Sequence, residues 1–243
     1  MTQSLEKLSV LGIPVHLLEN LENYTSWLRQ RLAQGEGTHV VTINPEMIML
    51  TEGDPSLAQI IQKAELVVPD GAGVVLYLRL KGKQQQRCPG IELAGSLIEQ
   101  AGKLGETCPV LFYGGSPGVA ASAAQWWCKQ VPQLSVTTSH GYLTNVTEKE
   151  LKQSIKTQQP KLILVGLGVP RQEYWISQNR HLAPNSIWIG VGGSFDIWSG
   201  GKSRAPVWLR NNHLEWLYRL YQEPWRWRRM LVLPQFALRV LVN

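Results

Sequence analysis

The sequence of 243 residues contains little cysteine and little charge. Its three cysteines, Cys88, Cys108 and Cys128, include no CxxC pair, which argues against a zinc site. Unpaired thiols are typical of a reducing compartment, so we expect a cytoplasmic protein. Charged residues make up only 17% of the chain and hydrophobic residues 44%, a composition that argues against disorder and allows a sizeable core.

No segment has the composition of a membrane-spanning helix. Residues 107–128 carry no charge, but their two prolines and three glycines are better explained by a buried strand, a turn and a helix. Residues 230–242 are too short to span a bilayer and include Pro234 and Arg239. The first ten residues lack the apolar centre of a signal peptide, so we expect none.

The net charge of the chain is concentrated near its C-terminal end. Residues 1–201 hold 16 basic and 16 acidic side chains, whereas residues 202–243 hold eight basic and two acidic ones, which leaves a net charge of +6 in that segment. Four of the ten tryptophans lie there as well. We therefore predict an α/β catalytic domain over residues 1–201 and a basic, Trp-rich helical appendage over residues 202–243, with the boundary near residues 200–206.

Short β-branched runs alternate with helical segments from about residue 39 onward. The strand-like runs are residues 39–44, 65–70, 109–115, 161–168 and 186–193, and the expected helices include residues 21–33, 91–104 and 117–130. Helix-start signals are Pro45 and Pro170 in first turns, Asp54 as a cap, and Thr147 with Glu150 as a capping box. Ahead of them, residues 8–18 suggest a strand or hairpin. The alternation predicts a Rossmann-like, open and largely parallel sheet with helices on both faces, which binds ligands at the carboxyl ends of its strands.

Three polar side chains lie at the ends of the first two predicted core strands. Thr42 and Asn44 stand where residues 39–44 end, and they either cap a helix or hold a sugar or an acceptor hydroxyl. Asp70 stands at the next strand end, where a carboxylate can act as a general base. The alternative for Asp70 is a plain Asp-Gly turn.

Three glycine-containing strings follow the other strands. Gly114 and Gly115 precede a helix start and can offer free N–H groups to an anion, although the chain has neither G-x-G-x-x-G nor a P-loop. Gln172 lies in the first turn of another helix, beside Glu173. An interaction with the helix dipole is one explanation for Glu173, but it does not explain Gln172. Asp196 follows a third glycine string and can accept hydrogen bonds from ribose hydroxyls, unless that string is a plain turn.

The predicted appendage is expected to form helices without strands, broken at Pro224 and at Pro234. Arg219, Arg226 and Arg229 would share one stripe of a continuous helix, which Pro224 would disturb. Arginine clusters bind phosphates in a bidentate manner. A solvated basic face and a nucleic-acid patch are the alternatives.

Together the motifs resemble one family, the WecG/TagA/CpsF glycosyltransferases (glycosyltransferase family 26). The matching strings are TINPEMI, PDGAGVV, PGIEL, FYGGSPGVA, HGY, VGLGVPRQEYWI, GVGGSFD, SGGKSRAPVW, LEWLYRL and EPWRWRRM. They extend from roughly residue 11 to residue 230, nearly the whole chain. So many strings in one order make the resemblance specific.

The resemblance implies an inverting enzyme of surface-polysaccharide or cell-wall polymer synthesis that needs no metal. It would move an N-acetylmannosamine-type sugar from a UDP donor to polyprenyl-diphosphate-linked N-acetylglucosamine at the inner face of the cell membrane. The implied roles are Asp70 as general base, Thr42 and Asn44 beside the acceptor or the transferred sugar, Gln172 in the catalytic pocket, Tyr142 and Asp196 beside the nucleoside, and Arg219, Arg226 and Arg229 at the diphosphate. Self-association until the appendage meets a membrane is implied as well.

The absence of any Asp-x-Asp fits this resemblance. A transferase without that motif must stabilise the departing UDP by other means, for which loop amides, a helix dipole and arginines are suited. Arginine with tryptophan also suits a membrane interface, and anionic lipid contributes about 1 kcal/mol per basic residue near the surface.

Two other interpretations stay open. The chain could be a transferase of the same family with another donor sugar, because one or two pocket residues would set that choice. It could also be a non-catalytic UDP-sugar-binding or membrane-docking protein, although Asp70, Thr42 and Gln172 together argue against this. Nucleic-acid binding is disfavoured by the neutral charge of residues 1–201.

Overall fold

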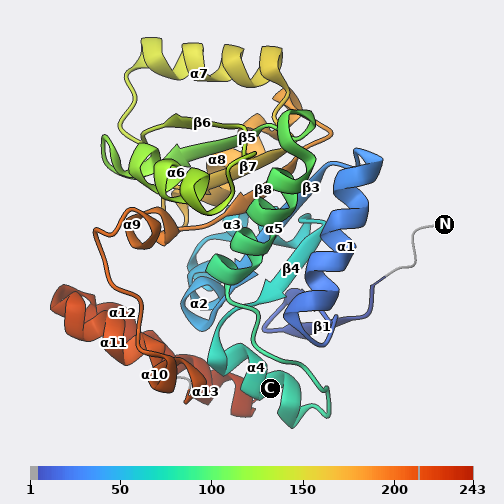
Figure 1. The fold of residues 1–243 in the computed structure, drawn as a ribbon. Coiled ribbons are helices and arrows are strands. Elements are labelled where there is room, and N and C mark those ends of the chain that lie inside the picture. The colour runs from blue at the N-terminus through green and yellow to red at the C-terminus, as the bar shows by residue number, and fades with distance from the viewer. Residues whose placement is uncertain (1–4, 213, 243) are drawn as a thin grey trace.

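A six-stranded parallel sheet forms the centre of the chain (Figure 1). The structure is a computed structural model that describes residues 5–212 and 214–242, apart from the side chain of Arg226. The strand order is β4-β3-β8-β7-β5-β6, and every neighbouring pair is parallel. This arrangement confirms the predicted Rossmann-like fold.

The five predicted core strands are present, together with one that was not predicted. The sheet consists of β3 (Thr38–Ile43), β4 (Leu66–Pro69), β5 (Val110–Gly114), β6 (Val136–Ser139), β7 (Leu162–Gly166) and β8 (Ile187–Gly190). A separate antiparallel hairpin is formed by β1 (Lys7–Val10) and β2 (Ile13–His16). The unpredicted strand is β6, an edge strand whose side chains are partly exposed, so that it lacks the apolar run of a fully buried strand.

Helices surround the sheet and continue beyond it. Those before residue 200 are α1 (Leu21–Gln34), α2 (Pro45–Gly53), α3 (Pro55–Gln62), α4 (Ala72–Leu80), α5 (Gly90–Leu104), α6 (Val119–Gln130), α7 (Asn145–Gln158), α8 (Arg171–Asn179) and α9 (Ser194–Trp198), with 3-10 turns η1 (Gly105–Thr107) and η2 (Arg180–Leu182). After residue 206 follow α10 (Val207–Asn211), α11 (Glu215–Gln222), η3 (Pro224–Arg226), α12 (Trp227–Met230) and α13 (Val232–Val242). We call residues 202–242 the tail and the part before it the body.

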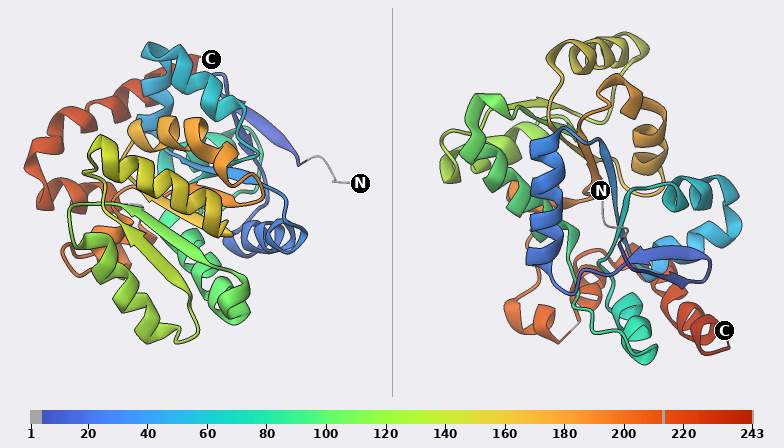
Figure 2. Two further views of the ribbon diagram at one scale, coloured as in Figure 1. Left: turned by 90° about the horizontal axis from the view of Figure 1, so that it is seen from above. Right: turned by 90° about the vertical axis from the view of Figure 1, so that its right-hand side faces the viewer.

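Side chains that alternate along the strands divide the core between the two faces of the sheet. On one face, Val40 and Phe112 pack with α1, α5, α6 and α9. On the other face, Val41 packs with α2, α3, α4 and the hairpin, and Ile163 packs with α7 and α8. Figure 2 shows these helices on opposite sides of the strands. Burial on both faces explains the continuous apolar runs of the central strands.

The chain leaves two neighbouring strands toward opposite faces of the sheet. After β3 it enters α2 on one face, and after β8 it enters α9 on the other. Because β3 and β8 are paired in the sheet, a crevice opens between their carboxyl ends. In open α/β sheets this is the place where ligands bind.

The tail packs against the body through its last helix. The side chain of Phe236 on α13 is only 3% exposed and belongs to the same core cluster as residues of α2 and α4. Arg239 and Glu52 add an ion pair of 3.6 Å between α13 and α2. Figure 1 shows the tail and α4 together below the sheet. Across the described ranges 5–212 and 214–242, no helix has the length and apolar character needed to cross a bilayer.

The observed helix starts agree in part with those predicted from the sequence. Pro45 occupies the first turn of α2, and the Asp54 carboxylate caps α3 by accepting from the N–H of Leu57, both as predicted. The capping box of α7 was placed wrongly, because Thr144 is the cap and Thr147 is its reciprocal partner. Pro170 precedes α8 instead of lying within its first turn.

The predicted break at Pro234 was also placed wrongly. Pro234 lies in the first turn of α13, where a missing N–H costs no helical hydrogen bond, and the helices separate at Leu231. The predicted break at Pro224 is confirmed, since α11 ends at Gln222. The domain division near residues 200–206 coincides with the segment between α9 and α10 and otherwise stays a prediction.

Substituting Phe236 by alanine should loosen the tail without unfolding the body. Removing a buried phenylalanine costs about 3–5 kcal/mol in a core, so the opening free energy of α13 should fall by a large part of that amount. Hydrogen exchange of the α13 amides measures this change. Leu238→Ala on the same helix is the control, because Leu238 is 66% exposed. Equal loss of protection in both variants would contradict the packing described.

Candidate active site

Two adjoining cavities lie at the carboxyl ends of β3, β4 and β8. The first, which we call the strand-end crevice, has a volume of about 150 Å³. Its body wall includes Thr42, Asn44, Asp70, Gln172 and the glycine loop 190–193, and its tail wall includes Glu215, Tyr218, Arg219 and Gln222. The crevice thus occupies the predicted ligand position and has one wall from the tail.

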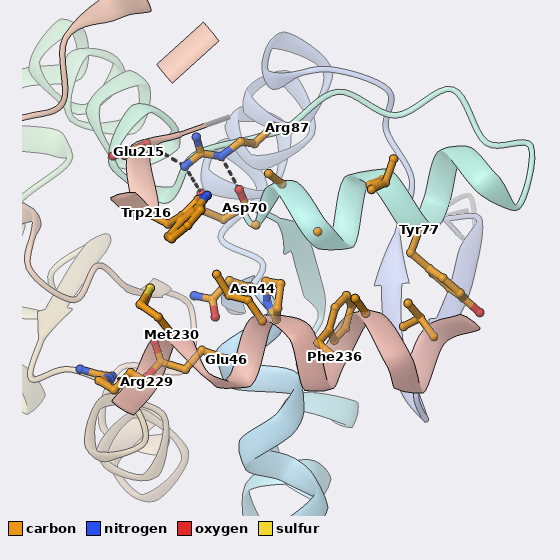
Figure 3. A pocket seen from close by; sticks show the side chains of 18 of the residues that line it. Asn44, Glu46, Asp70, Tyr77, Arg87, Glu215, Trp216, Arg229, Met230 and Phe236 are labelled. Carbon is orange, nitrogen blue, oxygen red and sulfur yellow. Dashed lines mark hydrogen bonds and ion pairs between the residues drawn. The ribbon is translucent and has the colours of Figure 1, made fainter. Parts of the chain in front are cut away.

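The second cavity, which we call the α4–α13 cavity, has a volume of about 480 Å³ and is largely apolar. Its apolar lining includes Leu76, Tyr77 and Leu80 from α4, and Leu233, Phe236, Ala237, Val240 and Leu241 from α13. Charged residues gather at one end of it, where Asp70, Arg87 and Glu215 lie near Glu46 and Arg229 (Figure 3). The cavity can therefore hold a molecule with one polar and one apolar end.

Four residues line both cavities, namely Asn44, Asp70, Glu215 and Arg219. Asp70 directly follows β4, and its backbone N–H donates to the Ile43 carbonyl at 3.0 Å. The next residue is a glycine because a Cβ on Gly71 would lie 2.4 Å from Cδ of Pro45. The turn after β4 therefore packs directly on the start of α2 and holds Asp70 at the junction of the cavities.

An ionic network surrounds Asp70. Nη2 of Arg87 lies 3.1 Å from Oδ1 of Asp70 and 2.8 Å from Oε2 of Glu215 (Figure 3). Burial disfavours the charge on Arg87, but the carboxylates of Asp70 and Glu215 outweigh burial and raise the pKa of Arg87. Burial likewise acts against the charged form of Glu215, but Arg219 and Arg87 lower the pKa of Glu215 overall.

Thr42, near the end of β3, and Asn44, just after it, have structural contacts as well as access to the site. Oδ1 of Asn44 accepts a hydrogen bond of 2.9 Å from the N–H of Met47, so Asn44 caps α2. Thr42 lies against Gly90 at the start of α5, where a Cβ would come within 2.8 Å of its Oγ1. Both line the strand-end crevice.

Gln172 and Glu173 are both buried, and each has a structural partner that the sequence did not reveal. Gln172 accepts a hydrogen bond of 3.0 Å from the N–H of Gly192, and its Nε2 donates to Glu173 at 2.9 Å. Glu173 also pairs with Nε2 of His39 at 2.8 Å. Attributing Glu173 to the helix dipole alone was therefore wrong, and Gln172 holds the glycine loop that borders the crevice.

Four of the residues predicted to bind the nucleotide, Gly114, Gly115, Tyr142 and Asp196, lie outside the linings of both cavities. The N–H of Gly115 donates to the Gly166 carbonyl at 3.0 Å, so the prediction of a free amide is wrong at Gly115, which follows Gly114 at the end of β5. Tyr142 is 70% exposed beyond β6. Asp196 lies on α9, next to the loop residue Gly193. Their role in nucleotide binding stays a prediction.

The tail arginines do not form one helical stripe. Arg219 lies on α11 and pairs with Glu215 at 3.1 Å, whereas Arg229 lies on α12 and pairs with Glu46. The helices are interrupted between Gln222 and Pro224, which explains the failure of the stripe. Arg219 borders both cavities and Arg229 only the α4–α13 cavity, while the side chain of Arg226 lies outside the described part of the structure.

Sequence reasoning missed Arg87, Glu215 and the apolar lining of the α4–α13 cavity. Glu215 carried one signal, since it is one of two acidic residues in the basic tail. Arg87 carried none, because its partners are 17 and 128 residues away. Within the described residues, no group of three or more His, Cys, Asp and Glu side chains is arranged to hold a metal ion.

Comparison with known proteins identifies the family. The Glycosyl transferase WecG/TagA/CpsF family matches residues 8–243. The chain is 37% identical over 212 residues to the N-acetylglucosaminyldiphosphoundecaprenol N-acetyl-beta-D-mannosaminyltransferase of Bacillus spizizenii, which covers 86% of this chain and 81% of that protein. Proteins of the same name from Bacillus subtilis and Staphylococcus aureus are 34% and 30% identical, each over 96% of this chain and over 90% and 92% of their own lengths.

The chain therefore belongs to the WecG/TagA/CpsF family and is a glycosyltransferase. This finding confirms the resemblance noted in the ordered sequence motifs. It also gives the two cavities a chemical context, because a transferase needs a place for a donor beside a place for an acceptor. Asp70 stands between the two.

Substituting Gly190 by alanine should disturb the body wall of the strand-end crevice. A Cβ there would lie 2.2 Å from Nε2 of Gln172 and 2.6 Å from Oε1 of Glu173. We expect the free energy of unfolding to fall by about 1–3 kcal/mol, measured by urea denaturation. Gly53→Ala is the matched control, because nothing lies within 4 Å of a Cβ on Gly53. Unchanged stability of Gly190→Ala would refute this packing.

Proposed function

We propose that the chain transfers an N-acetylmannosamine-type sugar from a UDP donor to polyprenyl-diphosphate-linked N-acetylglucosamine, with inversion and without a metal. The transferred sugar and the acceptor follow the names of the three relatives. One structural observation carries the proposal, namely the position of Asp70 where a polar crevice meets an apolar cavity. A sugar donor and a lipid-linked acceptor require such a pair of sites.

Asp70 supplies the general base in this proposal. With the donor sugar in the strand-end crevice, the acceptor hydroxyl oxygen attacks the anomeric carbon and its proton passes to the Asp70 carboxylate. The bond from the anomeric carbon to the phosphate oxygen breaks, and its electron pair leaves with UDP. Attack opposite the leaving group inverts the anomeric centre. Arg87 donates a hydrogen bond to Oδ1 of Asp70, so Oδ2 is available to accept the proton.

The departing UDP is stabilised by groups of the chain in this proposal. Arg219 borders the crevice and can bind a diphosphate through two N–H groups. The backbone of the glycine loop 190–193 lies on the opposite wall, where Gln172 holds it in place. Fixed donors of this kind stabilise developing negative charge without a metal ion.

The acceptor lipid occupies the α4–α13 cavity in this proposal. Its diphosphate lies at the charged end, beside Arg229, and its first isoprenyl units lie between α4 and α13. Burying an apolar chain is worth about 25 cal/mol per Å² removed from water. The hydroxyl of the intervening sugar then faces Asp70.

The tail also binds the membrane surface in this proposal. Large apolar side chains are exposed on α4 and along the tail, and they include Leu76, Leu80, Trp208, Tyr221, Trp225, Trp227, Leu238 and Leu241. The tail carries the whole net charge of +6 among these side chains. Basic and apolar residues on one segment favour the interface of an anionic bilayer.

Asp70→Asn should abolish transfer and leave the fold intact. An amide cannot take the proton, so we expect turnover to fall about 10²–10⁴-fold. Release of UDP from UDP-N-acetylmannosamine, with a short-chain prenyl-diphosphate N-acetylglucosamine as acceptor, measures this. The wild-type rate should be equal with and without EDTA.

The same assay distinguishes the alternatives. If another UDP-sugar is the donor, a screen of UDP-sugars in this assay will identify it. UDP binding without turnover on any acceptor would make the chain a non-catalytic binding protein. Full activity of Asp70→Asn would refute the assignment of the base, and inactivation by EDTA would refute transfer without a metal.

Binding to anionic vesicles should depend on both the charge and the apolar side chains of the tail. Sedimentation with vesicles of acidic phospholipid should capture the protein at low salt and release much of it at 1 M salt, where the Debye length is about 3 Å. Trp225→Ser, with the side chain 70% exposed, should weaken capture. Val146→Ser on α7 is the control, because it is 65% exposed on the body. Equal weakening by both variants would refute docking through the tail.

A further inference from the structure

Glu215 connects the tail to the site through Arg87 and also pairs with Arg219 on its own helix. Its side chain lies at the start of α11 and is almost fully buried. Oε2 of Glu215 accepts from Nη2 of Arg87 at 2.8 Å, and Oε1 accepts from Nη2 of Arg219 at 3.1 Å. A buried carboxylate with two arginine partners is costly to assemble unless each charge is satisfied, so this arrangement is specific.

Arg87 is the link between Glu215 and Asp70. Nη2 of Arg87 contacts the carboxylates of both Asp70 and Glu215, and Nε of Arg87 donates to the backbone carbonyl of Asp70. The guanidinium therefore holds Asp70 by its side chain and its backbone. Glu215 is the only tail residue that contacts Arg87 among the interactions described for residues 5–212 and 214–242.

We infer that Glu215 is a positioning residue for sugar transfer, which makes the orientation and the basicity of Asp70 depend on the docked tail through Arg87. The inference rests on the proposed function, in which Asp70 takes the proton of the acceptor. It deepens that proposal because it gives an acidic residue of the basic tail a part in the reaction. Glu215 touches neither the proton nor the reacting carbon.

The electrostatic consequence has a definite sign. Glu215 neutralises part of the charge that Arg87 directs at Asp70. Without the Glu215 charge, Arg87 acts on Asp70 alone and makes it harder to protonate. Without Arg87, Asp70 loses its cationic partner, and Asp70 becomes easier to protonate. The two removals therefore have opposite effects.

Among the other charged groups near Asp70, Arg219 on α11 loses its carboxylate partner in Glu215→Gln, and its positive charge then acts on Asp70 in the same direction as that of Arg87. The buried Cys88 follows Arg87 before α5, where Asp70 and Glu92 interact with it. Glu46 and Arg229, at the same charged end of the α4–α13 cavity, pair with each other. None of them forms the bridge from the tail to Arg87, so their influence does not reverse between the variants.

The tail has anchors besides Glu215. Phe236 is buried against the body, Arg239 pairs with Glu52, and Arg204 pairs with Glu92. A variant that removes only the charge of Glu215 therefore leaves these contacts in place. This separation allows the effect on the reaction to be distinguished from loss of the tail.

The test compares Glu215→Gln, Arg87→Gln and the double variant in the full chain, using single-turnover rates across pH. Both single variants should lower the rate about tenfold or more. The acidic limb of the rate profile should move to lower pH in Glu215→Gln and to higher pH in Arg87→Gln, each by roughly 0.5–1 unit. Glu52→Gln is the matched control, since it removes a tail–body ion pair away from Asp70 and should change neither property.

The double variant tests whether the effect passes through Arg87. In the Arg87→Gln background, Glu215→Gln should lower the rate by no more than about twofold, because the link is already broken. A further loss of rate from Arg87→Gln to the double variant, as large as that in Glu215→Gln alone, would overturn the inference, and Glu215 would then only anchor α11. This conclusion holds even if the tail is loosened in the variant. The inference would also be overturned if the acidic limbs of the two single variants moved in the same direction or did not move. An active Asp70→Asn would instead show that the assignment of the base had failed.

Discussion

The packing of α13 against α2 and α4 is the contact on which the site depends. Phe236 is buried there, and its helix forms one wall of the α4–α13 cavity. The same docked tail brings Glu215 and Arg219 to the strand-end crevice. The chain therefore builds its site from a body that positions Asp70 and a tail that closes both cavities around it. Loss of this packing would leave the sheet folded and the site open.

The second constraint is the divergence of the chain after β3 and β8, which opens the crevice between them. The two cavities meet at Asp70 because β4 lies on the other side of β3 and ends beside the start of α2. In the proposed reaction, the polar crevice holds the sugar nucleotide and the apolar cavity holds the lipid of the acceptor. The buried network of Arg87 and Glu215 ties the two halves of the molecule together at that point.

Much of this architecture follows from local patterns in the sequence. Buried strands such as residues 162–166 have continuous apolar runs, and the polar residues after β3 and β4 lie at the edge of the sheet where the crevice opens. The edge strand β6 lacks such a run and was missed. Arg87 and Glu215 were missed because an ion pair between residues 128 apart leaves no periodic signal. The amide of Gly115 could not be assigned because its partner belongs to the neighbouring strand β7.

The central claim is that a lipid-linked acceptor enters between α4 and α13 and presents its hydroxyl to Asp70. Photocrosslinking tests it most directly, with a prenyl-diphosphate N-acetylglucosamine that carries a photoreactive group on its second isoprenyl unit. After irradiation, mass spectrometry should locate the label on α4 and α13, among the lining residues Leu76, Leu80, Leu233 and Val240, and unlabelled acceptor should suppress it. Labelling concentrated elsewhere, for example in the surface groove that contains Trp126 and Trp198, would contradict the account.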